Sequence, residues 1–371
     1  IVISGSGVFT PEESITNKEL VTAYNAYAEI YNSTNSDDIR KGNKATLEFS
    51  SEEFIYKASG IKNRFVMDKK GILDPNIMHP ILDKRGNDEP SILAEISVKA
   101  AKKAMKSAGK ISHDIDAVIT ACSNLERAYP AVSIEVQELL GIKGFAFDMN
   151  VACSSATFAI QAAADMIKSG SAKTILIVDP EICSGHLDFK DRDCHFIFGD
   201  VCTAMILEKK ETAKSSNAFE ILSTKCITQF SNNIRNNFGF LNNAKKSKPL
   251  DRDLLFMQEG RKVFKEVVPM VSQLIFNHIE EEKIKVEEIK RLWLHQANKS
   301  MNDFIGKKVL GRVPEVHEQP NILQDYANTS SAGSIIAFSL FNEDMKKGDV
   351  GVLCSFGAGY SAGSIILKKI S

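Results

Sequence analysis

Short apolar runs alternate with amphipathic stretches along most of this chain. Five runs have the length of a β-strand, at residues 117–120, 174–178, 204–207, 292–294 and 350–353. Longer stretches between them, such as residues 91–108 and 156–168, are rich in Ala, Ile and Lys and have a helical pattern. Alternation of this kind predicts an α/β protein whose sheets are mostly parallel and buried on both faces.

The pattern also repeats within the chain. Residues 114–124 align without gaps with residues 288–298, and both segments end in Asn. The start of the segment 327–332 (ANTSSA) matches residues 152–156 (ACSSA), and residues 356–369 match residues 198–210. Three pairs in the same order predict a duplicated half, although α/β proteins can also look self-similar because strands and helices recur. We expect the halves to be residues 1–212 and 213–371.

Two segments do not fit the duplicated pattern. Residues 22–53 are polar and rich in Asn and Ser, and residues 67–90 carry prolines and scattered charges. We expect both to be surface insertions, acting either as a lid over a site or as passive decoration.

Composition narrows the class of protein. The chain has 371 residues, 43% of them hydrophobic and 25% charged, with a net charge of -1 that favours neither nucleic acid nor an anionic membrane as a partner. Neither an apolar run of about 18 residues nor a signal-peptide pattern is present, so we expect no membrane insertion. Seven cysteines without a disulfide-type spacing indicate reduced thiols and a cytoplasmic location.

Cys153 is the first candidate for chemistry. It follows an extended segment and precedes an apolar helix, where the helix dipole and free N–H groups lower the pKa of a thiol. Small neighbours on both sides let another backbone approach it. These are the requirements of a nucleophilic cysteine. Free cysteines are more often small buried hydrophobes, and we assign the other six to that class.

Two further side chains converge on Cys153. His295 ends an apolar strand, and ligands of α/β sheets bind at such strand ends. Asn328 occupies in the second half the place that Cys153 holds in the first. The duplication therefore predicts that two helix N-termini face each other across a pseudo-twofold axis. The glycine-rich segment 355–363 lacks the Lys-Ser/Thr ending of a P-loop and fits a loop that presents a backbone N–H to an oxyanion.

These motifs together resemble a known family. The segments VACSSA, HQAN, YANTSSA, FGDVCTAMIL and SFGAGYSAGS, with ISGSGVFTPEESITNKEL and SGIKNR, are similar to β-ketoacyl-acyl-carrier-protein synthase III of the thiolase superfamily. The resemblance covers nearly the whole chain except the two inserted segments. It implies a thiolase-like α/β fold of duplicated, five-layered α-β-α-β-α halves with mixed, mostly parallel sheets, and a homodimer.

The resemblance also implies a mechanism. Cys153 would be the acylated nucleophile, His295 and Asn328 two side-chain donors, and the backbone N–H groups of Cys153 and Ala358 the oxyanion hole. An acyl-coenzyme A or acyl-carrier-protein thioester would acylate Cys153. Malonyl-acyl-carrier protein would then lose carbon dioxide, with a neutral His295 that donates from Nε2–H. No cofactor and no metal are needed.

Residues that would hold the substrates are implied in the same way. Phe54 stands where family members stack a Trp on adenine, Ala58 replaces an Arg that holds coenzyme A, and Arg192 matches a position that contacts coenzyme A. Tyr129 matches an aromatic residue that bounds the acyl tunnel of the partner subunit. Further substrate-binding positions are Asn298, Gly357 and Gly359. Positions for docking the carrier protein are Lys265, Lys299, Lys307 and Lys308.

Other functions stay open at this stage. The chain could transfer an acyl group or condense without decarboxylation, although hydroxymethylglutaryl-type enzymes need a glutamate base and no Glu stands beside these motifs. A non-catalytic thiolase-fold subunit is a third possibility, against which the intact Cys-His-Asn set argues. A zinc site is a fourth, but its spacing matches no common zinc module. The four residues it would use are Cys183, His186, Cys194 and His195.

Overall fold

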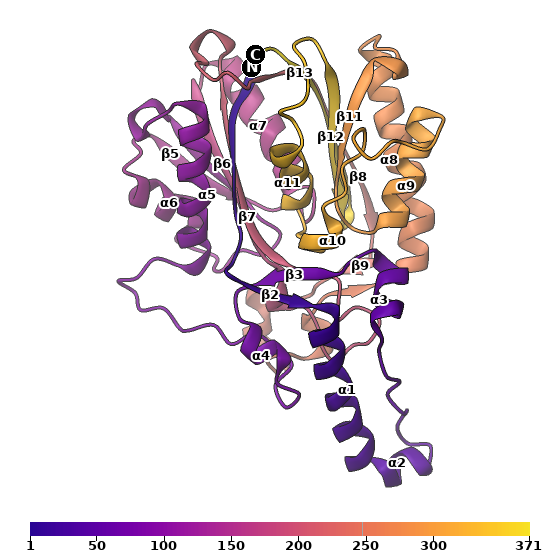
Figure 1. The fold of residues 1–371 in the computed structure, drawn as a ribbon. Helices are drawn as coiled ribbons and strands as arrows, with labels where there is room; N and C mark the ends of the chain where they lie inside the picture. Colours follow the sequence, from indigo (N-terminus) through magenta and orange to yellow (C-terminus); the bar gives the residue numbers. More distant parts are fainter. Residues whose placement is uncertain (247) are drawn as a thin grey trace.

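A nine-stranded mixed sheet organises the computed structural model, which describes residues 1–246 and 248–371 (Figure 1). Its strands follow the order β11-β12-β13-β8-β1-β7-β6-β4-β5. They are β1 (Val2–Phe9), β4 (Ala117–Ala121), β5 (Phe145–Met149), β6 (Thr174–Ile182), β7 (Asp200–Glu208), β8 (Phe219–Ser231), β11 (Ile289–Leu294), β12 (Val350–Gly357) and β13 (Gly359–Lys369). The five predicted strands all lie within these elements, which confirms them.

The strand directions differ in part from the expectation. Only the pairs β4–β5, β4–β6 and β11–β12 are parallel, and the other five pairings are antiparallel. The sheet is therefore mixed, and the expectation that it is mostly parallel is wrong. The reason lies in the connections. No long crossover helix lies between β6 and β7 or between β12 and β13, and a parallel pair needs such a crossover.

Helices form three layers around the two parts of this sheet. Helices α5 (Ile92–Ala108) and α6 (Val132–Leu140) cover one outer face, and α8 (Gly260–Glu281) and α9 (Lys299–Leu310) cover the other (Figure 1). Helices α7 (Ser155–Ser169) and α11 (Ala332–Leu340) lie between the two parts and contact strands of both. Their buried alanines and isoleucines share one core cluster. The five layers thus belong to the whole molecule and not to each half, because both halves share the central helical layer.

The strand order repeats between the first and second parts of the chain. The order β4-β6-β7-β1 in the first part corresponds to β11-β12-β13-β8 in the second. In both orders the first pair of strands is parallel and the next two pairs are antiparallel, and β5 has no counterpart among the described residues. In place of β5, Leu292 N donates to the Glu318 carbonyl at 2.7 Å, so an irregular segment runs beside β11. This repetition supports the predicted duplication; the division after residue 212 stays a prediction.

A smaller layer closes one end of the molecule. It consists of β2 (Glu13–Thr16), β3 (Asn63–Val66), α1 (Asn17–Thr34), α2 (Ser36–Arg40), α3 (Glu52–Ser59), α4 (Lys69–Leu73), β9 (Ile234–Arg235), β10 (Met257–Gln258) and α10 (Leu323–Tyr326). A capping box of Thr16 and Glu19 starts α1, which projects from the body together with α2 (Figure 1). The expected insertion boundary at residue 22 therefore falls inside a helix. In the described parts of the chain, no helix has the length and apolarity that a membrane crossing requires.

Candidate active site

Cys153 stands on a tight elbow between β5 and α7. Ala152 adopts a positive φ of 47°, and Asn150 and Ser155 fix the turn by side-chain bonds to the N–H groups of Ala152 and Val151, both 2.9 Å long. Non-glycine residues with positive φ are uncommon and cluster at functional sites. The elbow holds the thiol next to Gly357 of the second half.

Asn328 stands on an equivalent elbow after α10. Ala327, the residue before it, has a φ of 57°. Asn328 N donates to the Ile197 carbonyl at 2.9 Å, and its carbonyl accepts from Gly199 N at 3.0 Å. Both Cys153 and its counterpart Asn328 thus follow an alanine with a positive φ. The backbone repeats the correspondence that the sequence predicts.

Ser330 brings the three predicted residues together. Its hydroxyl donates to Cys153 Sγ at 3.4 Å, and its N–H donates to Asn328 Oδ1 at 2.8 Å. Its carbonyl accepts a hydrogen bond from the His295 imidazole. Our sequence reasoning overlooked Ser330, although its position two residues after Asn328, in the segment matched to the nucleophile motif, was a signal.

His295 is buried at the end of β11. Burial lowers the pKa of the imidazole to about 4, so the ring is neutral near pH 7. The Ser330 backbone acts against burial by raising this pKa, and Nδ1 is buried without a hydrogen-bond partner in the described part of the chain. Asn302 fixes the backbone by donating to the His295 carbonyl at 2.9 Å, and Phe356 packs edge-on against the ring at 5.1 Å. The lowered pKa agrees with the expected neutral state of His295, and the expected Nε2–H donor stays a prediction.

The thiol of Cys153 differs from its expectation. Burial raises its pKa to about 11, although hydrogen bonds from the Ser330 hydroxyl and the Ala358 N–H lower it. The expectation of a lowered pKa is therefore wrong. The N–H group of Ala156, in the first turn of α7, donates to Ser331 Oγ at 2.6 Å and not to the sulfur. The negative charge of Glu181 raises the pKa further.

The glycine-rich segment reaches the sulfur from the other half. A Cβ atom on Gly357 would lie 2.5 Å from Cys153 Cβ, so only glycine permits this approach. The Ala358 N–H then points at Sγ. A backbone donor in this position fits the expected oxyanion hole, which stays a prediction. Gly359 turns the chain with a φ of 130°.

Two buried carboxylates lie beside Cys153 and were missed in the sequence. Asp179 and Glu181 alternate along β6 and point to the same side of the strand. Burial raises the pKa of Glu181 to about 7, and burial together with Glu181 raises the pKa of Asp179 well above its usual range. The signal was present in TILIVDPEI, where two acids interrupt an apolar strand. No Glu stands beside the motifs in the sequence, and Glu181 reaches Cys153 through the fold.

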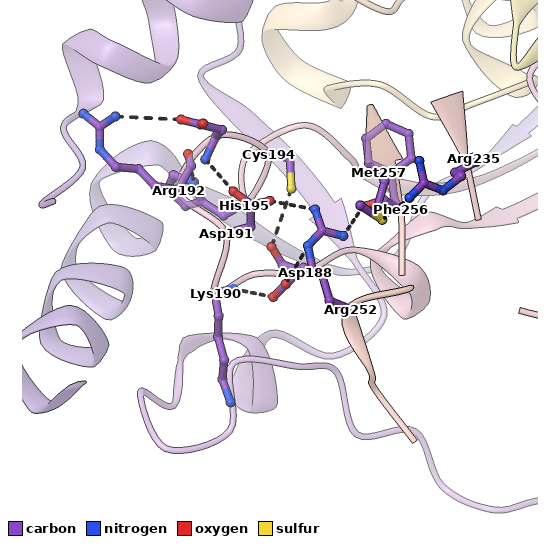
Figure 2. Close-up of polar contacts among 11 residues, drawn as sticks. Asp188, Lys190, Asp191, Arg192, Cys194, His195, Arg235, Arg252, Phe256 and Met257 are labelled. Atoms are coloured by element: carbon purple, nitrogen blue, oxygen red, sulfur yellow. Dashed lines mark hydrogen bonds and ion pairs between the residues drawn. The ribbon is translucent and has the colours of Figure 1, made fainter. Parts of the chain in front are cut away.

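Phe54 and Arg192 meet at the surface. The Arg192 guanidinium lies 4.0 Å from the centroid of the Phe54 ring, and its Nε donates to the Phe49 carbonyl at 2.8 Å. Arg252 holds the loop before Arg192 by bonds to Asp191 at 2.7 Å and to Asp188 at 3.3 Å (Figure 2). The two positions expected to contact coenzyme A therefore form one feature.

The remaining expected substrate and docking residues lie apart from the thiol. Asn298 caps α9 through Ser300 N at 2.9 Å and donates to the Ala58 carbonyl at 2.6 Å, which gives it a structural task. The side chain of Tyr129 is 85% exposed. The expected docking lysines are exposed on the packed helices α8 and α9, namely Lys265, Lys299, Lys307 and Lys308.

The four residues of the zinc alternative do not converge as ligands. His186 packs against the rings of Phe198 and Phe256 at 5.1 and 6.2 Å, and His195 packs on Tyr24 at 4.8 Å. Within residues 1–246 and 248–371, no group of three or more His, Cys, Asp or Glu residues is placed to hold a metal ion.

Comparisons with known proteins agree with this geometry. Family models described as 3-Oxoacyl-[acyl-carrier-protein (ACP)] synthase III and its C terminal part match residues 147–229 and 279–369. The chain is 58% identical to a beta-ketodecanoyl-[acyl-carrier-protein] synthase of Pseudomonas aeruginosa, over 94% of this chain and 99% of that protein. It is 30% identical to a beta-ketoacyl-[acyl-carrier-protein] synthase III of Clostridium perfringens, over 88% and 94%. A solved 3-oxoacyl-[acyl-carrier-protein] synthase III from Aquifex aeolicus shares the fold, with a TM-score of 0.77 and 23% identity over 99% of both chains.

The fold and these likenesses define a thiolase-fold condensing enzyme. The chain belongs to the 3-oxoacyl-acyl-carrier-protein synthase III family, the acyltransferases of fatty-acid biosynthesis that the sequence motifs resemble. The predicted family, fold and enzyme class are thereby confirmed.

Proposed function

We propose that this chain joins an acyl group, held as a thioester on Cys153, to a malonyl thioester that loses carbon dioxide. Cys153 Sγ attacks the acyl thioester, and the N–H groups of Cys153 and Ala358 stabilise the oxyanion. His295 and Asn328 donate hydrogen bonds to the malonyl thioester oxygen and stabilise the enolate that remains after decarboxylation. The enolate carbon then attacks the acyl-Cys153 carbonyl.

The arrangement around Ser330 is the observation that carries this proposal. Its N–H occupies Asn328 Oδ1, which leaves the Asn328 amide hydrogens as donors. The neutral His295 has a single N–H, which lies toward the Ser330 carbonyl in the free protein and would turn to the malonyl thioester oxygen when the substrate binds. Two neutral donors beside a buried thiol suit the stabilisation of an enolate, because neither adds a charge that would need to be desolvated.

We infer that the product is a β-ketoacyl chain of ten carbons. The support is the 58% identity to a protein named beta-ketodecanoyl-[acyl-carrier-protein] synthase. Decarboxylative condensation adds two carbons, so the acyl group on Cys153 would have eight. We propose acyl-coenzyme A or acyl-carrier protein as its donor and malonyl-acyl-carrier protein as the second substrate. Arg192 and Phe54 would hold the coenzyme, and the lysines of α8 and α9 the carrier protein.

We further propose a cytoplasmic homodimer. All seven cysteines are free thiols in the structure, which fits a reducing compartment. Tyr129, largely exposed in the single chain, would bound the acyl tunnel of the partner subunit. Light scattering should then give twice the mass of 40.9 kDa, and Tyr129→Ala should change the preferred acyl length without changing that mass. A monomer with an unchanged length preference would contradict both statements.

Intact-protein mass spectrometry tests the central step. The protein is incubated with acyl-coenzyme A thioesters of graded length, and Cys153→Ala serves as the control. We expect a mass gain that requires Cys153 and is largest for the eight-carbon acyl group. If none of the acyl-coenzyme A thioesters gives a gain, the same test with acyl-carrier-protein thioesters decides whether a carrier protein is the donor. No gain with either donor would refute the acyl-enzyme.

Decarboxylation tests the roles of His295 and Asn328. His295→Ala and Asn328→Ala should still accept the acyl group on Cys153, because neither side chain forms the oxyanion hole. They should release carbon dioxide from malonyl thioester at least about a hundredfold more slowly, since each removes a hydrogen bond to the enolate. Release at the parental rate in both variants would show that the enolate is stabilised elsewhere.

A further inference from the structure

The buried carboxyl groups of Asp179 and Glu181 both act on the pKa of Cys153, and the steps above do not use them. Both are 1% exposed. Within the part of the chain that the structure describes, neither makes an ion pair with Lys, Arg or His. A buried carboxylate without a cation is costly, so it persists only where hydrogen bonds or a function hold it.

Hydrogen bonds hold Glu181 in one orientation. Ser123 donates to it from both its N–H, at 3.0 Å, and its hydroxyl. Ser331 N, at the start of α11, donates to Glu181 Oε1 at 3.4 Å. These donors, and the helix N-terminus to which Ser331 belongs, favour the ionised form. Burial and these hydrogen bonds therefore shift the pKa of the carboxyl in opposite directions, and the result is a pKa of about 7.

Ser330 connects this carboxyl to the nucleophile. Its hydroxyl donates to Cys153 Sγ at 3.4 Å, and a hydrogen bond from the same hydroxyl to Glu181 lowers the pKa of that carboxyl. Because the hydroxyl has a single proton, it must rotate from the sulfur to the carboxylate before it can accept the thiol proton. The serine hydroxyl can donate one proton and accept another. Cys153, Ser330 and Glu181 thus form a continuous path for a proton that leaves the thiol.

Charge also favours transfer along this path. The Glu181 charge raises the pKa of the Cys153 thiol, because a thiolate beside a carboxylate would place two negative charges in one buried pocket. Moving the proton from sulfur to Glu181 keeps a single negative charge there. His295 is a poor acceptor by comparison, since burial holds its pKa at about 4.

We propose that Glu181 is the general base for acylation of Cys153 and that Ser330 relays the proton between them. This inference deepens the proposed function and rests on its acyl-Cys153 step. In the step, the Cys153 S–H bond breaks and its proton passes to Ser330 Oγ, while the Ser330 hydroxyl proton passes to the Glu181 carboxylate. The sulfur electron pair forms the S–C bond to the thioester carbonyl. When the tetrahedral intermediate collapses, the C–S bond to the leaving thiol breaks, and that thiolate takes the proton back from Glu181 through Ser330.

The other titratable groups around Glu181 are a second carboxyl and four thiols. Asp179 lies on the same strand, and burial together with the charge of Glu181 raises the pKa of its carboxyl well above the usual range. The neighbouring thiols come from four further segments, and burial raises the pKa of each. They are Cys122 after β4, Cys153 before α7, Cys183 after β6 and Cys202 in β7. Glu181, with its pKa near 7, is the member of this cluster that changes charge around neutral pH.

Alkylation of Cys153 by iodoacetamide measures this relay without any condensation. Glu181→Gln keeps the shape of the side chain and removes both the charge and the base. If Glu181 only repels the thiolate, the variant alkylates faster than the parent at pH 7.5. If Glu181 takes the proton, it alkylates at least about tenfold more slowly, and the inflection near pH 7 disappears. The two readings therefore predict changes of opposite sign, and a faster or unchanged rate overturns the proposal.

Two further variants keep the test independent of folding. Ser330→Ala interrupts the relay and should slow alkylation to a similar extent, and the double variant should be no slower than the slower single one. Asp200→Asn is the matched control, because Asp200 is a buried carboxyl that binds Ser184 and not Cys153. We expect it to alkylate within about twofold of the parent. Cys153→Ala gives the background from other thiols. Additive losses in the double variant would also overturn the relay.

Acylation by acyl-coenzyme A is measured in the same variants. If the parent alkylates with an inflection near pH 7 but accepts no acyl group from either donor, the proposed condensation fails and the base assignment stands. If the parent is acylated and Glu181→Gln is acylated at the same rate, the base assignment fails and the condensation stands.

Discussion

The reactivity of Cys153 depends on how closely other backbone segments approach its side chain. Gly357 supplies the closest of these approaches, and the Ala358 N–H follows it directly toward the sulfur. Ala152 accepts a positive φ so that the elbow can place Sγ there. Small residues from both halves therefore position the proposed nucleophile, and their size is as important to the site as the polar groups are.

Gly357→Ala should impair acylation. The new Cβ would lie 2.5 Å from Cys153 Cβ and 2.9 Å from Sγ, so either the elbow or the loop must move. We expect acylation of Cys153 to slow by about ten- to a hundredfold and the free energy of unfolding to fall by about 1–3 kcal/mol. Ala358→Gly is the control, since it keeps the backbone N–H and should retain most of the rate. Equal acylation rates in the parent and Gly357→Ala would mean that the contact is unimportant.

At this scale the sequence suggested the candidate residues and missed what connects them in the structure. Cys153, His295 and Asn328 have recognisable positions in motifs, because each sits at a strand end or a helix start. Ser330 and Glu181 take their meaning from contacts between distant parts of the chain. The pKa of Cys153 was expected to be low from its local position alone. Burial by the second half, which local reasoning does not include, reverses that direction.

Elements from three parts of the chain form the feature proposed to hold coenzyme A. Helix α3 carries Phe54, and the loop between β6 and β7 carries Arg192. Arg252, from the second half, pins that loop through two aspartates (Figure 2). The aromatic ring and guanidinium are already in contact, so a flat adenine ring can stack on a surface that needs little reordering.

Arg192→Ala should weaken binding of acyl-coenzyme A more than it slows the chemistry. We expect KM for acyl-coenzyme A to rise by about tenfold with kcat nearly unchanged, since the guanidinium acts on the ground state and the transition state alike. Lys190→Ala is the charge-matched control, because Lys190 is on the same loop but lies over Tyr27 and points away from Arg192 (Figure 2). A similar rise in KM for both variants would indicate a general charge effect. No rise for Arg192→Ala would argue against a coenzyme A donor.

The positions of the strands could be predicted from the sequence, whereas their directions depend on the connections between them. Apolar runs located the strands of the main sheet because burial on both faces leaves a clear signal. Their directions were mistaken where a strand returns without a crossover helix, as β13 does after β12. The polar segment 22–53 was expected to be an insertion of unknown form. Its first part instead belongs to α1, a helix that begins five residues earlier at the capping box of Thr16 and Glu19.

The molecule as a whole buries titratable groups of both kinds, and they act on its stability in opposite directions. Burial lowers the pKa of His186, His195, His278 and His295 to about 4. These histidines bind protons in the unfolded chain below pH 6.5 and in the folded chain only near pH 4, so they destabilise the fold as the pH falls between these values. Burial raises the pKa of Asp200 to about 6 and of Glu181 to about 7. The folded chain therefore binds these protons before the unfolded chain does, so these carboxyls add to the free energy of unfolding as the pH falls.

His186 offers a way to separate these contributions, because both of its ring nitrogens are buried without hydrogen-bond partners between Phe198 and Phe256. His186→Phe removes the proton that the unfolded chain takes up, so its advantage in the free energy of unfolding should grow as the pH falls from 6.5 toward 4. The difference is at most about 1.4 kcal/mol per pH unit, or about 2 kcal/mol between pH 7 and pH 5. Urea unfolding at a series of pH values measures it. The exposed His113, replaced by Asn, should leave the slope of the parent unchanged. A parallel pair of curves for the parent and His186→Phe would show that His186 is solvated in the native protein, and the acid sensitivity would then have to come from His195, His278 and His295.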